Sequence, residues 1–191
     1  DLAPISDDDK NYYRNIPQGW TIFKLNDFGF FKKGPFGSSL TKSMFVDKYT
    51  PNCVKVYEQK NAIQHNCLLG NYYISHDKYI ELKSFEVFPN DIIVSCAGTI
   101  GEIYKLPQSA EKGIINQALM KISLYDISTS DYFELILQDT LHKLSNKVKG
   151  TAIKNIVPFE ILKPAQVIVP PLSEQRRIIN KIYLMKKLLL F

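Results

Sequence analysis

The stretch VIVPPLSEQ, residues 167–175, decides how this chain is organised. Its β-branched start predicts a buried strand over Val167–Val169. Pro170 and Pro171 end that strand, because neither proline can donate to a sheet ladder. Ser173 is then the expected N-cap of a helix, and Glu174 places negative charge in the first turn, where the helix dipole favours it. The stretch therefore predicts a closing strand followed by a helix.

The helix after this stretch carries an apolar seam. Its seam residues follow one another at spacings of four, three and four, and they are Ile178, Ile182, Met185 and Leu189. This is the spacing of a long amphipathic helix of coiled-coil type. The apolar run reaches Phe191 without the Gly, Asn or polar cap that usually ends a helix. We therefore expect a partner helix, a continuation of this helix, or both.

Length and composition favour one globular domain with a small appendage. The chain has 191 residues, of which 45% are hydrophobic and 23% charged, so it can bury a core. No apolar run approaches the roughly 20 residues that span a bilayer, and Asp1–Pro4 does not begin a signal peptide. Cys53, Cys67 and Cys96 have no C-x-x-C spacing. We expect free thiols, a cytoplasmic location and no membrane contact.

Positive charge is concentrated towards the end of the chain. Residues 140–191 contain ten Lys and Arg but two Glu, a local charge of +8, which leaves −3 of the net +5 for residues 1–139. This distribution suggests binding to a polyanion or to an acidic protein surface. A solvated helix face would explain it equally well.

Hydrophobic periodicity predicts many short strands and two helices. A single mid-chain helix is expected over residues 131–146, and the segment from Phe28 to Phe45 is expected to be a loop. Residues 92–96 and 102–106 should form a hairpin around Gly98–Gly101. The other expected strands cover residues 21–25, 53–58, 72–74, 79–82 and 118–122. The fold class is therefore α/β, a mixed-sheet α+β domain with a protruding C-terminal helix.

Two loops carry residues suited to phosphate contacts. Glycines allow a backbone to approach a ligand closely, and Ser and Lys side chains are common phosphate contacts. The first candidate set consists of Lys33, Gly34, Phe36, Gly37, Ser38, Ser39 and Lys42, and the second of Lys147, Lys149, Gly150 and Thr151. An irregular surface loop is the plain alternative for the first set.

Amide and acidic side chains gather where two of the expected strands meet loops. Asn and Gln can pair bidentately with adenine, and Glu can accept from cytosine. The candidate contact residues here are Tyr57, Glu58, Gln59, Asn61, Asn116 and Gln117, of which Glu58, Gln59 and Asn61 are expected to contribute to base readout. Such residues are also common in loops with no ligand.

The sequence gives little support for catalysis. His65, His76 and His142 lack the spacing of a metal site, and no G-x-S-x-G elbow is present. Asn155–Phe159 lacks the tandem proline of the amino-methyltransferase motif, and no glycine-rich cofactor loop accompanies it. We therefore expect a binding protein with no metal and no cofactor of its own.

An ordered set of motifs resembles the target recognition domain of type I restriction-modification specificity subunits. The resemblance covers nearly the whole chain. It is carried by Ile16–Trp20, Gly34–Leu40, Val56–Ile63, Asp91–Ser95 with Gly98–Gly101, Asn116-Gln117, Lys149–Thr151 and the PPLSEQ stretch.

The resemblance implies a non-catalytic subunit that binds double-stranded DNA sequence-specifically. Residues 1–172 would be the recognition domain, and residues 173–191 the start of a spacer helix that pairs with a second recognition domain or a second copy of the chain. Methyltransferase subunits that use S-adenosylmethionine, and a motor-nuclease subunit that uses ATP and Mg, would supply adenine methylation and cleavage. Family members carry two recognition domains, whereas this chain has the length of one.

Two other functions stay open at the level of sequence. The chain could be a protein-interaction module that docks through its C-terminal helix, and such a module should show little salt-sensitive binding to duplex DNA. It could also be a nuclease or methyltransferase with an unrecognised site, which turnover by the isolated chain would reveal.

Overall fold

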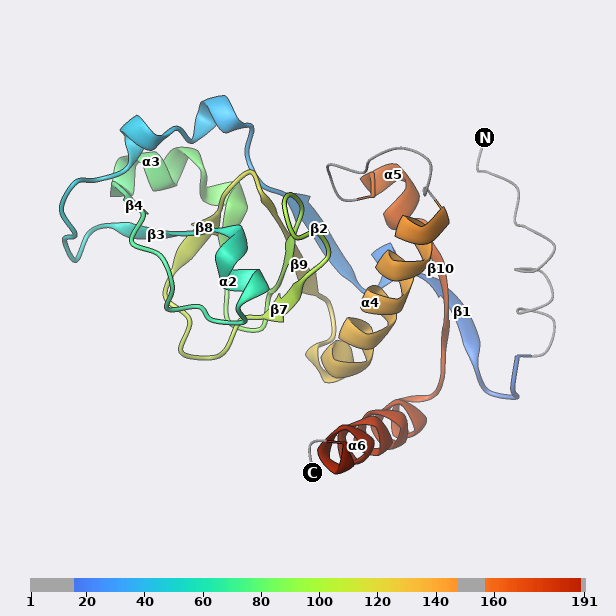
Figure 1. Cartoon of the computed structure of the whole chain (residues 1–191). Coiled ribbons are helices and arrows are strands. Elements are labelled where there is room, and N and C mark those ends of the chain that lie inside the picture. The colour runs from blue at the N-terminus through green and yellow to red at the C-terminus, as the bar shows by residue number, and fades with distance from the viewer. Residues whose placement is uncertain (1–15, 148–156, 190–191) are drawn as a thin grey trace.

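The computed structural model describes residues 16–147 and 157–189, and Figure 1 shows their arrangement. Two four-stranded sheets lie beside a two-stranded ribbon, and a long helix leaves the domain at its C-terminal end. Within these residues, none of the helices has the length and apolar character needed to cross a membrane.

The described residues combine short strands with helices of different lengths. The strands are β1 (Thr21–Lys24), β2 (Gly29–Lys33), β3 (Val54–Tyr57), β4 (Tyr73–Ile74), β5 (Glu86–Val87), β6 (Ile92–Ser95), β7 (Ile103–Lys105), β8 (Gly113–Ile115), β9 (Leu119–Leu124) and β10 (Gln166–Val169). The α-helices are α2 (Gln59–Ile63), α3 (His76–Glu81), α4 (Ser130–Lys147), α5 (Phe159–Leu162) and α6 (Leu172–Leu188). Five 3-10 helices complete the described residues: η1 (Leu25–Asp27), η2 (Gly37–Ser39), η3 (Lys42–Met44), η4 (Lys83–Phe85) and η5 (Ile127–Thr129).

The first sheet has the order β2-β9-β6-β7 and is antiparallel throughout. All four residues of β6 are buried. Ile92 and Val94 enter one hydrophobic cluster, and Ile93 enters another. Because successive side chains of a strand point to opposite faces, β6 is covered on both sides. The continuous apolar run Ile92–Ser95 in the sequence follows from this position.

The second sheet, β4-β3-β8-β5, combines a parallel β3–β8 pair with antiparallel neighbours. The prediction of a mixed sheet is therefore confirmed. Helix α4 covers the first sheet through Phe133, Leu137 and Leu141, which are buried and spaced by one helical turn. The helix expected over residues 131–146 is thus confirmed.

The two-stranded ribbon pairs a strand near the start of the described chain with a strand near its end. Strand β1 pairs antiparallel with β10, in a register that places Thr21 opposite Val169. The predicted closing strand and its proline stop are confirmed. The predicted N-cap is wrong: Pro171 is the N-cap of α6, and Ser173 lies inside the first turn.

Three sequence-based assignments of secondary structure are also wrong. The expected loop over residues 28–45 begins with β2, whose Gly29 packs so closely on β9 that an added Cβ would lie 2.5 Å from the Ser123 carbonyl oxygen. The expected strand 79–82 is the end of α3, because Ser75 caps a helix by accepting from the Lys78 amide. Residues 59–63, expected to be irregular, form α2.

Helix α6 is present, but its coiled-coil pairing stays a prediction. Ile178 is partly buried and packs against the hydrophobic cluster between α4 and the first sheet, and Ile182 is also partly buried. Met185 and Leu189 are exposed, the latter with 83% of its surface accessible. The seam therefore contacts the domain at its start and extends into solvent at its end.

Candidate nucleic-acid interface

Three of the predicted contact segments meet at one end of the two sheets. The Gly34 amide donates to the Leu119 carbonyl at 2.9 Å, and the Asn116 amide donates to the Tyr57 carbonyl at 3.0 Å. These bonds join the end of β2, the end of β3 and the β8–β9 turn. We call this place the strand-end junction, formed by residues 33–34, 57–59 and 116–117.

Gly34 is required at the junction for steric reasons. A Cβ atom at this position would lie 1.8 Å from the Asn116 carbonyl oxygen, far inside van der Waals contact. The loop that follows is therefore pressed directly against the β8–β9 turn.

Gln117 is the exposed residue of the β8–β9 turn. Its neighbour Asn116 shapes the turn instead, because its side-chain oxygen accepts from the Ala118 amide at 3.0 Å. Of the two predicted amides, Gln117 is thus the one that is free to face a ligand.

Gln59 lies against the β6–β7 hairpin turn. A Cβ added to Gly98, whose φ is +65°, would lie 3.3 Å from Gln59 Nε2. The buried Gln59 Oε1 has no hydrogen-bond donor in the described part of the chain. A buried acceptor without a donor costs free energy, and an amino group of a nucleobase could complete it.

Glu58 is held by an adjacent lysine. Lys60 Nζ lies 2.7 Å from Glu58 Oε2. Gly70, with φ +91°, lies against both side chains, because its added Cβ would be 3.1 Å from each. Glu58 can therefore accept from a base only in competition with Lys60.

Asn61 and Tyr57 have structural roles, and their side chains do not face the interface. Asn61 is fully buried, and its amide donates to the Asn66 and Leu69 carbonyls at 2.9 and 2.8 Å. The buried Tyr57 hydroxyl donates to the Glu111 carbonyl at 2.7 Å, and burial raises the pKa of Tyr57 above its ordinary value. Neither side chain can reach a ligand in this structure.

The glycine-containing loop projects from the junction on two buried anchors, Pro35 and Leu40. Between them the Ser39 amide donates to the Phe36 carbonyl at 2.8 Å, which forms the turn η2. Phe36 has 85% of its surface accessible. Lys33, Gly37, Ser38 and Lys42 are also exposed, whereas Ser39 is partly buried. The loop thus presents an exposed glycine backbone, hydroxyls and cations together.

The second candidate set for phosphate contacts, in residues 147–151, lies largely outside the described residues. Lys147 is the last residue of α4, and Lys149, Gly150 and Thr151 lie beyond the part of the chain that the structure describes. Their contribution stays a prediction.

Sequence reasoning missed the hairpin turn as a part of this site. Ser95 holds the turn, because its hydroxyl donates to the Thr99 carbonyl at 2.5 Å and accepts from the Glu102 amide at 3.0 Å. The pair Gly98 and Gly101, both with positive φ, was the available signal. Its proximity to Gln59 depends on tertiary packing.

The described part of the chain does not form a metal site. Residues 16–147 and 157–189 contain no group of three His, Cys, Asp or Glu that could hold a metal. Cys67 and Cys96 are buried thiols, and burial raises the pKa of Cys96 to about 12. Such a thiol is a poor nucleophile at neutral pH.

Comparison with known proteins identifies the class. Residues 17–183 match the family described as "Type I restriction modification DNA specificity domain". The match covers most of the sequence, and the chain belongs to this family. The family is one of recognition domains. No match was found among curated proteins.

Solved structures share the fold. One, described as "Structural basis underlying complex assembly and conformational transition of the type I R-M system", has TM-score 0.64, 18% identity and coverage of 92% of this chain. The HsdS subunit from Thermoanaerobacter tengcongensis has TM-score 0.64, 17% identity and 92% coverage. The type I S subunit from M. genitalium has TM-score 0.53, 15% identity and 91% coverage. This chain spans about 40% of the length of those chains.

Proposed function

We propose that this chain reads one part of a double-stranded DNA target for a type I restriction-modification system. The observation that carries the proposal is the strand-end junction, where Lys33, Gln59 and Gln117 come from three segments far apart in the sequence. Membership of the specificity-domain family supports the choice of DNA as the ligand.

The division of work between side chains follows their chemistry. Lys33 and Lys42 would contact phosphates and fix the register of the domain on the duplex, and the Gly37-Ser38 backbone and hydroxyl would follow the same strand. Gln59 and Gln117 would meet base edges, because amides read donor and acceptor patterns in the major groove. Lys147, Lys149, Gly150 and Thr151 would extend the phosphate contacts.

Helix α6 would connect the DNA-binding domain to the rest of an assembly. We propose residues 1–172 as the recognition domain and residues 173–191 as the start of a spacer helix. Support comes from α6 itself, whose seam residues Met185 and Leu189 are exposed although they are large and apolar. A second recognition domain or a second copy of the chain would cover them in a coiled coil.

The chemistry would belong to partner subunits. A methyltransferase subunit with S-adenosylmethionine would modify adenine, and a motor-nuclease subunit with ATP and Mg would cleave. This chain would have no cofactor of its own and would act in the cytoplasm, where these partners meet the host DNA.

Methylation of host DNA tests the proposal. The full-length parent subunit is co-expressed with its neighbouring methyltransferase, and the modified bases are sequenced. We expect a single motif in two separated parts that carries N6-methyladenine, and a palindromic motif would favour pairing of two copies. If both proteins form a soluble complex without new methylation, the DNA-reading proposal is wrong.

Exposed apolar residues on α6 favour a second candidate, a protein-interaction module without a DNA role. The two candidates differ in their response to salt. Release of counterions from DNA makes duplex binding fall steeply with salt concentration, whereas an apolar helix interface is much less sensitive.

A further inference from the structure

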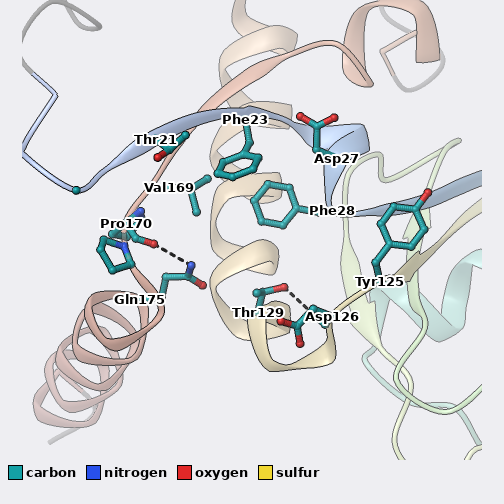
Figure 2. A pocket seen from close by; sticks show the side chains of 12 residues that line it. Thr21, Phe23, Asp27, Phe28, Tyr125, Asp126, Thr129, Val169, Pro170 and Gln175 are labelled. Carbon is teal, nitrogen blue, oxygen red and sulfur yellow. Dashed lines mark hydrogen bonds between the residues drawn. The ribbon is translucent and has the colours of Figure 1, made fainter.

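A pocket lies at the end of the domain opposite to the strand-end junction. Its volume is about 360 Å³, and it opens between the β1–β10 ribbon, the η5–α4 corner and the start of α6 (Figure 2). In Figure 1 these elements lie on the far side of the first sheet from α2 and β3. We call it the ribbon pocket, and its chemistry is set by Phe23, Asp27, Phe28, Tyr125, Asp126 and Gln175.

Gln175 brings an unused acceptor to the inner end of the pocket. Only 6% of this residue is accessible, and its Nε2 donates to the Pro170 carbonyl at 3.0 Å. Its buried Oε1 has no donor in the described part of the chain. Figure 2 shows this oxygen pointing away from Pro170, towards Thr129 on the other side of the pocket. An occupant that donates a hydrogen bond there would complete it.

Two carboxylates supply further acceptors at the pocket mouth. Asp27 Oδ2 accepts from the Lys24 amide at 2.8 Å, and Asp126 Oδ1 accepts from the Ser128 amide at 2.9 Å. Hydrogen bonding by Ser128 also lowers the pKa of Asp126, so this group is charged at neutral pH.

Neither carboxylate has a cation partner among the described lysines and arginines. The nearby Arg177 is engaged in a two-point pair with Glu174, with both N–O distances 2.6 Å. The pocket therefore carries negative charge that the described lysines and arginines do not neutralise.

The walls between these acceptors are aromatic. Phe23 and Phe28 meet edge to face with their ring centroids 5.9 Å apart. Phe23 is 41% accessible and Tyr125 is 73% accessible, which is unusual for side chains of this size. Figure 2 shows Asp27 and Asp126 on opposite sides of Phe28.

Acceptors around aromatic faces fit an arginine better than other side chains. Its guanidinium has five N–H donors and no acceptor, stacks on aromatic rings, and keeps its charge at any physiological pH. A lysine has a compact, strongly hydrated ammonium that gains less from such a wall.

We propose that the ribbon pocket binds an arginine side chain presented by a protein partner docking beside the start of α6. The guanidinium lies against the aromatic wall between Asp27 and Asp126, and one N–H reaches Gln175 Oε1. The proposal is independent of DNA reading, because it uses none of the junction residues.

Titration of the full chain with N-acetyl-arginine N-methylamide, followed by NMR, tests the pocket. We expect saturable binding with shifts at the Gln175 side-chain amide, and at least tenfold weaker binding by the Asp27→Asn, Asp126→Asn double variant. The control Glu160→Gln on α5 should bind as the unmodified chain does. The citrulline analogue has nearly the same shape without charge, and the lysine analogue has charge without the planar group. Equal binding by either analogue, or an unaffected double variant, would overturn the proposal.

A cross-link identifies the occupant in the assembled complex. Tyr125 is replaced by p-benzoylphenylalanine, and the complex with the methyltransferase subunit is irradiated. We expect a cross-link to an arginine-containing peptide of another chain. A cross-link that stays within the same chain would overturn the assignment to a partner, and unchanged duplex binding by the Asp double variant would show that the DNA interface is intact.

Discussion

At the scale of single residues, a substitution of Gln59 tests whether this side chain contacts a base or only forms part of a loop. Replacing it with Ala removes an amide whose Oε1 lacks a donor beside the hairpin turn. We expect relaxed preference at one base position, at a cost of about 1–3 kcal/mol for the preferred base. Binding to a library of duplexes measures this. Gln64→Ala, an exposed position that follows α2, is the control, and unaltered preference of the Gln59 variant would exclude it from base contact.

Lys42 should behave differently, because phosphates carry no sequence information. Lys42→Gln should weaken binding to all duplexes alike and reduce the slope of log K against log salt by about one. Titrations at several salt concentrations measure the slope. A change in sequence preference instead would show that Lys42 contacts a base.

Asn61 should matter for stability rather than for recognition. Asn61→Ala would leave the Asn66 and Leu69 carbonyls and the Glu58 amide without their side-chain partner. We expect a loss of roughly 2–4 kcal/mol in the free energy of unfolding, with the base preference of the folded fraction unchanged. Urea unfolding measures the first effect, and duplex binding below the transition measures the second.

At the scale of elements, the contact between the glycine-containing loop and the β8–β9 turn forms the junction. Gly34→Ala should cost about 2–3 kcal/mol of stability, because the new methyl group would collide with the Asn116 carbonyl. Gly37→Ala is a matched control in the same loop, since no described residue other than its chain neighbours has an atom within 4 Å of its added Cβ. Equal thermal stability of the two variants would contradict the close packing at Gly34.

Element prediction from the sequence succeeded where a local signal was clear and failed where it was absent. Helix α4 has a clear helical period, and the β6–β7 hairpin has a β-branched run followed by Gly98 and Gly101, so the sequence predicts both. Strands β5 and β8 contain two and three residues and carry no turn or β-branched signal as clear as that of the hairpin, so the sequence does not predict them. Tyr79 and Leu82 were read as strand residues, yet both enter one cluster at a spacing of three, which only a helix allows.

The candidate site was predicted by residue type but not by placement. The sequence offered six amide, acidic and aromatic candidates near strand ends, and it could not show that Asn61 and Tyr57 point inward. It also missed the hairpin turn beside Gln59, because that contact joins segments about forty residues apart. Burial and long-range proximity are properties of the tertiary fold, so composition gives no access to them.

At the scale of the whole molecule, the assembly depends on the seam of α6. Ile182→Asp would place a charge in the centre of an apolar interface, so we expect association with the partner helix to weaken more than about tenfold. Analytical ultracentrifugation of the complex measures this, with the exposed Asn180→Asp as the control. Normal assembly of the Ile182 variant would show that the partner docks elsewhere.

The first turns of the spacer helix α6 should stabilise the recognition domain that precedes them. Ile178 and Ile179 pack against the core formed by α4 and the first sheet, and Gln175 bonds to the Pro170 carbonyl. A chain ending at residue 172 loses these contacts, so it should unfold with roughly 2–4 kcal/mol less free energy than the full sequence. A chain ending at residue 183 keeps them and should match the full sequence within about 0.5 kcal/mol, because the exposed turns beyond it contact no core. Urea unfolding of the three chains measures both differences. If the 1–172 chain were as stable as the others, the first turns of α6 would add no stability to the domain, and the helix would serve its partner alone.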